Sequence, residues 1–186
     1  MTAKSRIDGV TQVALTTQVN SIACKPDAKQ LWVTRIARGK HAADVLLDAT
    51  TLAVLTDTAT PPDEAGWLPV ATLDKGLITR SRQWTVGVNA SGLFIKDLQS
   101  QALKAPAPFN DPTLTVTAFA ISADERWAVI GNTSGYVVVY EVATGDRRWG
   151  ARIHRGHVTA ACICPDGQRA FTGSATGELC AIELPD

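Results

Sequence analysis

The strongest constraint on the fold is an internal repeat with a period of 42 to 43 residues. The segment RQWTVGVNASG, which begins at Arg82, aligns with ERWAVIGNTSG, which begins at Glu125, so that identical tryptophan, valine, asparagine, serine and glycine residues stand 43 positions apart. The next step along the chain is 42 residues, from Gly135 to Gly177. A period of this length indicates a supersecondary unit that buries its apolar face by stacking on its neighbours.

The residues within each repeat predict strands rather than helices. Valine, threonine, isoleucine and tryptophan are dense, turn residues recur every several positions, and no long stretch has apolar residues at a helical period. We therefore expect an all-β domain over residues 1–186, built of four units with four strands in each complete unit. The expected units span residues 18–60, 64–108, 112–153 and 154–186.

The last unit, GHVTAACICPDGQRAFTGSATGELCAIEL, resembles the WD-repeat family. It opens with Gly156 and His157, has Asp166 in its first turn and ends its second turn at Gly177. The unit before it follows the same plan, whereas the first unit inserts a longer loop around residues 37–43. The resemblance implies a β-propeller, and it implies structural roles for these residues: His157, Asp124, Asp166, Gly135 and Gly177.

The two ends of the sequence predict how the last unit is completed. Three strands precede the end of the sequence in the fourth unit, and GVTQVALTT, within residues 1–17, stands where an outer strand of a preceding unit would lie. We expect this strand to close the last blade, because propellers avoid open edges. We favour two chains that close an eight-bladed ring as a homodimer by reciprocal exchange of this strand. A four-bladed monomer and a ring completed by a different chain are the alternatives.

The sequence favours an interaction module over an enzyme. It has no phosphate-binding glycine loop, nucleophile elbow or metal-ligand spacing. We expect His157 to form a structural hydrogen bond within its blade, although Thr176 and Ile182 stand where the family has Asp and Trp. Cys162 and Cys164 alternate along one strand, and we expect them to pack between blades. We therefore expect a non-catalytic protein–protein interaction scaffold with no catalytic residues, metal or cofactor; a propeller hydrolase or lyase is the enzyme alternative.

The charge pattern predicts one local binding surface. Lys plus Arg and Asp plus Glu number 18 each, so we expect no bulk attraction to nucleic acid or to an anionic membrane. Basic residues gather where loops of the first and last units would share one rim of a propeller, and there an acidic peptide is the expected partner. The residues of this surface are Arg38, Lys40, His41 and Arg155. No apolar leader or membrane-spanning run is present, which predicts a cytoplasmic protein.

Overall fold

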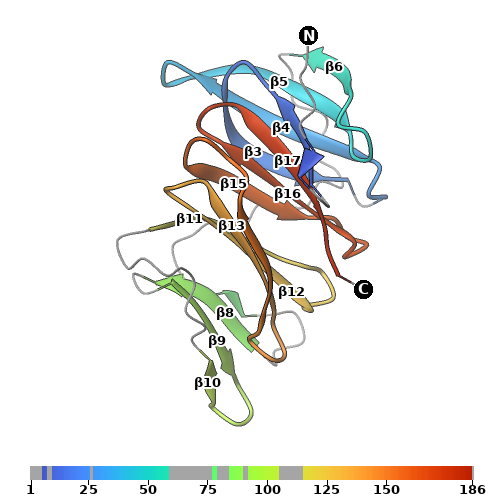
Figure 1. The fold of residues 1–186 in the computed structure, drawn as a ribbon. Helices are drawn as coiled ribbons and strands as arrows, with labels where there is room; N and C mark the ends of the chain where they lie inside the picture. Colours follow the sequence, from blue (N-terminus) through green and yellow to red (C-terminus); the bar gives the residue numbers. More distant parts are fainter. Residues whose placement is uncertain are drawn as a thin grey trace.

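The computed structural model describes residues 6–7, 10–25, 27–58, 77–78, 84–89, 92–104 and 115–185. Within these residues every regular element is a β-strand, and the strands form four antiparallel sheets (Figure 1). The predicted all-β class is therefore confirmed. The unit boundaries predicted between 60 and 64 and between 108 and 112 lie outside the described residues. In the same part of the chain, no helix is long and apolar enough to cross a membrane.

Three of the sheets are meanders in which consecutive strands pair. The first sheet contains β3 (Gln18–Cys24), β4 (Gln30–Ala37), β5 (Lys40–Asp48) and β6 (Val54–Thr58). The second sheet contains β7 (Leu77–Ile78), β8 (Trp84–Asn89), β9 (Gly92–Asp97) and β10 (Leu103–Lys104). The third sheet contains β11 (Val116–Ile121), β12 (Trp127–Asn132), β13 (Tyr136–Glu141) and β14 (Arg147–Arg152).

The fourth sheet joins strands from the two ends of the described chain. Its strands, in spatial order, are β15 (Val158–Ile163), β16 (Arg169–Ser174), β17 (Glu178–Glu183), β2 (Val10–Ala14) and β1 (Arg6–Ile7). β2 runs antiparallel to β17, with Val13 opposite Leu179. The sequence favours a second copy as the acceptor of this strand; in the structure the acceptor is β17 of the same chain. The reason is that β2 continues after three residues into β3, whose sheet packs on the fourth sheet.

The four sheets stack in the order first, fourth, third, second (Figure 1). Three clusters of buried apolar residues fill the three gaps between neighbouring sheets. Val19 and Phe171 lie between the first and fourth sheets, and Val139 and Val158 lie between the third and fourth. Among the described residues, no cluster joins the first sheet to the second. The arrangement of the described strands is therefore an open stack with the first and second sheets at its ends.

The repeat is visible in small backbone features as well as in whole sheets. In the innermost strands β3, β11 and β15, the pairing with the next strand shifts in register at the residue that follows a valine. These valines are Val19, Val116 and Val158. In the turn after each of these strands, an aspartate side chain accepts a hydrogen bond from the amide two residues later. The aspartates are Asp27, Asp124 and Asp166. These are the local bonds that the sequence predicts for turn aspartates.

Gly135 and Gly177 lie at equivalent turns and make equivalent contacts with the next sheet. Both have a positive φ, of 81° and 83°, which favours glycine. The Gly135 carbonyl accepts hydrogen bonds from the amides of Ile153 and His154, just before the fourth sheet, at 3.1 and 3.2 Å. The Gly177 carbonyl accepts one from Leu15, just before the first sheet, at 2.5 Å. The first sheet therefore follows the fourth in the same way that the fourth follows the third.

The prediction of a longer loop around residues 37–43 is wrong. β4 and β5 are joined by a two-residue hairpin turn at Arg38 and Gly39. Both residues have a positive φ, of 51° and 74°, as in a type I′ turn, whose backbone twist matches that of the flanking strands. The extra residues of the first unit therefore lengthen the two strands instead of forming a loop.

Candidate functional site

The connection between β14 and β15 positions the candidate site at one end of the fourth sheet. The amides of Ile153 and His154 donate to the Gly135 carbonyl, which fastens the start of this connection to the third sheet. The next residue, Arg155, donates its amide to Glu178 at the start of β17, at 2.7 Å. The backbone amides of the connection therefore donate hydrogen bonds to both sheets that it joins, to a carbonyl of the third sheet and to a carboxylate of the fourth.

His154 is the buried histidine of this connection. Its side chain is completely buried, and its Nε2 shares a 2.8 Å hydrogen bond with Oγ1 of Thr172 in the middle of β16. Its Nδ1 lies 3.7 Å from Oε2 of Glu178 and 3.8 Å from Sγ of Cys180. Burial lowers the pKa of His154 to about 4, against a smaller opposing effect of the Glu178 carboxylate. The imidazole is therefore neutral near pH 7.

The sequence assigns this structural role to His157, and the structure places His154 there instead. The side chain of His157 is exposed. The Gly-His pair at 156–157 drew the assignment, but the bonds to the Gly135 carbonyl turn the chain three residues earlier and direct His154 inward.

Glu178 is the second polar group that stabilises the site. It is 8% exposed, and its Oε2 accepts hydrogen bonds from the Arg155 amide at 2.7 Å and from Thr176 Oγ1 at 3.1 Å. A longer bond of 3.4 Å comes from Ser174 Oγ. Nε of Arg155 lies 3.6 Å from the other carboxylate oxygen. The charge of Glu178 is thus balanced within the site, as a nearly buried carboxylate requires.

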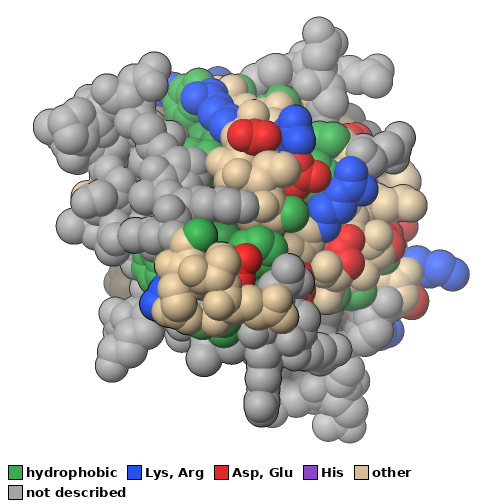
Figure 2. Space-filling view, turned by 90° about the horizontal axis from the view of Figure 1, so that it is seen from below, with side chains coloured by type: hydrophobic (Ala, Val, Ile, Leu, Met, Phe, Trp, Pro, Cys, Tyr) green, Lys and Arg blue, Asp and Glu red, His purple; other side chains and the backbone are tan. Residues whose placement is uncertain are grey.

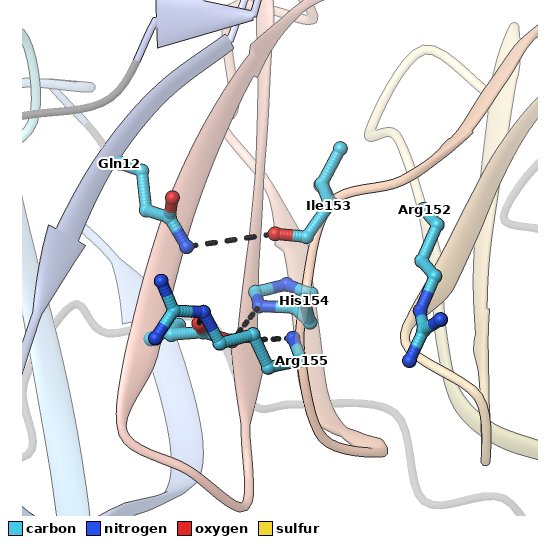
Figure 3. Close-up of a pocket in the computed structure, with 6 residues that line it drawn as sticks. Gln12, Arg152, Ile153, His154 and Arg155 are labelled. Atoms are coloured by element: carbon cyan, nitrogen blue, oxygen red, sulfur yellow. Dashed lines mark hydrogen bonds and ion pairs between the residues drawn. The ribbon is translucent and has the colours of Figure 1, made fainter.

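A pocket of about 440 Å³ opens beside these groups (Figure 3). Its lining residues come from β2, β14, the β14–β15 connection and β17, and they are Gln12, Arg152, Ile153, His154, Arg155 and Glu178. The Gln12 amide donates to the Ile153 carbonyl at 3.5 Å. The side chains of Arg152 and Arg155 extend to either side of the His154 backbone in Figure 3, and that of Arg155 is 92% exposed. The outward-facing groups of the pocket are therefore cationic.

The predicted basic surface is only partly assembled here. Arg155 lines the pocket, and Arg38 and Lys40 are exposed at the β4–β5 turn of the neighbouring first sheet. His41 lies opposite Ile36 in the β4–β5 pairing, and its side chain is not among those that the structure describes. The sequence expects the last and first units to meet between two chains, whereas the structure brings them together within one. Arg152 joins the surface without having been predicted as one of its residues.

Two other arginines of the third sheet are used locally. Arg148 forms an ion pair with Glu141, and this contact lowers the pKa of the Glu141 carboxyl. Arg147 lies over the ring of Tyr136, 5.6 Å from its centroid, and donates to its hydroxyl at 3.2 Å. The face of the molecule in Figure 2 accordingly shows basic and acidic side chains interspersed rather than a continuous basic field.

The buried polar groups of the site are engaged with neighbouring groups of the same chain. His154 and Glu178 are enclosed by bonds to their own sheet, and the described residues contain no group of three or more His, Cys, Asp or Glu side chains that could hold a metal ion. Comparison with protein-family models and with curated protein sequences found no match to the chain.

Proposed function

We propose that this chain is a non-catalytic interaction scaffold of the WD-repeat propeller type, and that its rim pocket binds an acidic peptide. The repeated antiparallel sheets support the scaffold, because each sheet presents its turns at the two ends of its strands. A cytoplasmic location belongs to the same proposal.

The cations of the pocket carry the peptide proposal. Arg152 and Arg155 are exposed, whereas the one carboxylate in the pocket lining, that of Glu178, is nearly buried and already hydrogen-bonded. An incoming carboxylate therefore meets guanidinium groups before it meets a negative charge. Because the two guanidinium groups lie apart on either side of the His154 backbone, they suit two carboxylates spaced along an extended peptide better than one compact anion.

The experiment is a binding titration with fluorescein-labelled hexaglutamate, followed by fluorescence anisotropy at low salt. We expect the double variant R152E/R155E to bind at least about tenfold more weakly, because reversal removes two attractions and adds two repulsions. The matched control is K29E, which reverses an exposed charge at the β3–β4 turn, at the opposite end of the first sheet from the β4–β5 turn. Equal affinity in the double variant and the wild type would contradict the proposed site.

A second candidate function is that of a subunit that completes a propeller ring with another chain, either a second copy or a different polypeptide. The open stack favours it, because the first and second sheets lie at the two ends. Val54 and Leu55 in β6, on the end sheet, are 53% and 49% exposed. Large apolar side chains exposed next to one another on an outer strand favour burial against a partner.

A further inference from the structure

Two cysteines meet in the cluster between the first and fourth sheets. Cys24 is the last residue of β3, and Cys164 follows the last residue of β15. Their relative exposures are 2% and 0%, and their Sγ atoms lie 2.6 Å apart. The residues are separated by 140 positions in the sequence, so the contact exists only because the first sheet packs on the fourth.

The sulfur–sulfur distance is shorter than a contact between non-bonded sulfur atoms. A disulfide bond is about 2.05 Å long, so the two side chains need to approach by only a small further step. Both side chains belong to the buried cluster between the two sheets, which also contains Phe171 and Leu179 of the fourth sheet. The sheets therefore present the two thiols to each other without a rearrangement of the strands.

We propose that Cys24 and Cys164 form a reversible disulfide bond that covalently links the first sheet to the fourth. The oxidant is a small-molecule disulfide such as glutathione disulfide. One cysteine thiolate attacks it and forms a mixed disulfide with release of one thiol; the second cysteine then attacks the protein sulfur and releases the other. The two cysteines together lose two protons and two electrons, and the small disulfide is reduced to two thiols.

Burial decides when this bond forms. The hydrogen bond to Cys24 and burial raise the pKa of the Cys164 thiol, so the attacking thiolate is scarce in the folded chain. Oxidation therefore occurs as the chain folds or when the joint between the two sheets opens. Once formed, the bond is shielded from reducing thiols by the same packing.

Cys162, in β15, provides a matched control close to Cys164. It lies two residues before Cys164, is partly exposed, and packs against the same cluster. Burial also raises its pKa. Cys164, by contrast, has the sulfur of Cys24 on the first sheet at 2.6 Å.

The experiment refolds the full chain in a mixture of glutathione and glutathione disulfide, followed by alkylation and mass spectrometry. We expect an intact mass that corresponds to two alkyl groups on the chain instead of the four of the reduced chain, and one cross-linked peptide pair that contains Cys24 and Cys164. C24S and C164S should lose the cross-link, and C162S should keep it. The oxidised wild type should melt about 5 to 10 °C above the reduced form, because the bond constrains a long loop of the unfolded chain.

The peptide map of the wild type decides the outcome even if a serine variant fails to fold. Four alkylated cysteines after refolding in glutathione disulfide would overturn the proposal. A cross-link that joins Cys162 to Cys24, or that joins two chains, would overturn it as well, because neither follows from the contact between these two sulfurs.

Discussion

The neutral imidazole of His154 links the β14–β15 connection to the middle of the fourth sheet. Its bond to Thr172 satisfies two buried polar groups at once, and a buried group left unpaired costs about 1 to 3 kcal/mol. The nearby Glu178 carboxylate holds the amide of the following residue, Arg155. Together the two side chains take the place of water that would otherwise solvate the polar groups of this connection. They thereby hold in place the backbone that lines the rim pocket.

The pKa of His154 predicts a loss of stability in mild acid. The folded pKa is about 4, below the ordinary value of 6.5, so the unfolded chain takes up a proton first as the pH falls. The contribution of His154 is complete above pH 6.5 and is lost between pH 6.5 and 4. The two values correspond to at most roughly 3 kcal/mol. Urea unfolding at a series of pH values measures the free energy of unfolding across this window.

The control for this measurement is H154Q, which removes the titration and keeps an amide that reaches Thr172. We expect the slope of stability against pH between 4 and 6.5 to be clearly smaller in H154Q. If the two proteins have the same slope, another group controls the acid sensitivity.

At the scale of single elements, the repeated turns act as the joints between sheets. The amide of Leu15 donates to the Gly177 carbonyl, so the chain is held to the β16–β17 turn at the point where it leaves β2 for the first sheet. A Cβ at Gly177 would overlap the carbonyl oxygen of Leu15, which shows how closely the two segments approach. The turn is thus a contact surface and not merely a connection.

We expect G177A to destabilise the protein far more than G39A. Both glycines have a positive φ, of 83° and 74°, so alanine costs about 1 to 2 kcal/mol at either site from backbone conformation alone. A Cβ at Gly39 meets nothing within 4 Å, whereas at Gly177 it displaces the backbone of Leu15. The free energy of unfolding should therefore fall by about 2 kcal/mol more in G177A. An equal loss of unfolding free energy in the two variants would show that the close contact between Gly177 and Leu15 contributes nothing to stability.

The sequence predicts individual strands and turns better than it predicts the contacts between sheets. The turn aspartates Asp124 and Asp166 follow from local chemistry, because an aspartate in a turn can accept a hydrogen bond from the amide two residues later without any contact from another sheet. The burial of His154 depends on a carbonyl from another sheet, at Gly135, which no local pattern contains. The hairpin at Arg38 was missed because arginine rarely adopts a positive φ, and the pairing of the flanking strands imposes it.

At the scale of the whole molecule, the order of the sheets limits how the protein can assemble. The N-terminal strand β2 covers the edge of β17, and its Val10 and Val13 enter the clusters on opposite faces of the fourth sheet. Exchange of this strand between copies would replace these contacts with identical ones and add none. A second chain would bury additional apolar surface by packing against the ends of the stack, where Val54 and Leu55 are exposed.

The last prediction separates these two modes of assembly with one engineered cysteine. Gln12 lies directly opposite Cys180 in the β2–β17 pairing, and both side chains approach the Ile153 carbonyl, at 3.5 and 3.7 Å. Oxidised Q12C should therefore form a bond within one chain and migrate on a non-reducing denaturing gel at the 19.8 kDa of a single chain. The variant Q12C/C180S is the control. A band at twice this mass that disappears in the control would show that β2 is exchanged between copies.

Light scattering of the same tethered protein then tests whether the ends of the stack are covered by a second copy. With β2 fixed in its own chain, a native mass of two chains cannot arise from strand exchange. We expect that mass for oxidised Q12C, and we expect V54K/L55K to reduce it to one chain, because two buried charges without partners are costly. A single-chain mass for the tethered wild-type surface would contradict a homodimer and leave a different polypeptide as the chain that completes the ring.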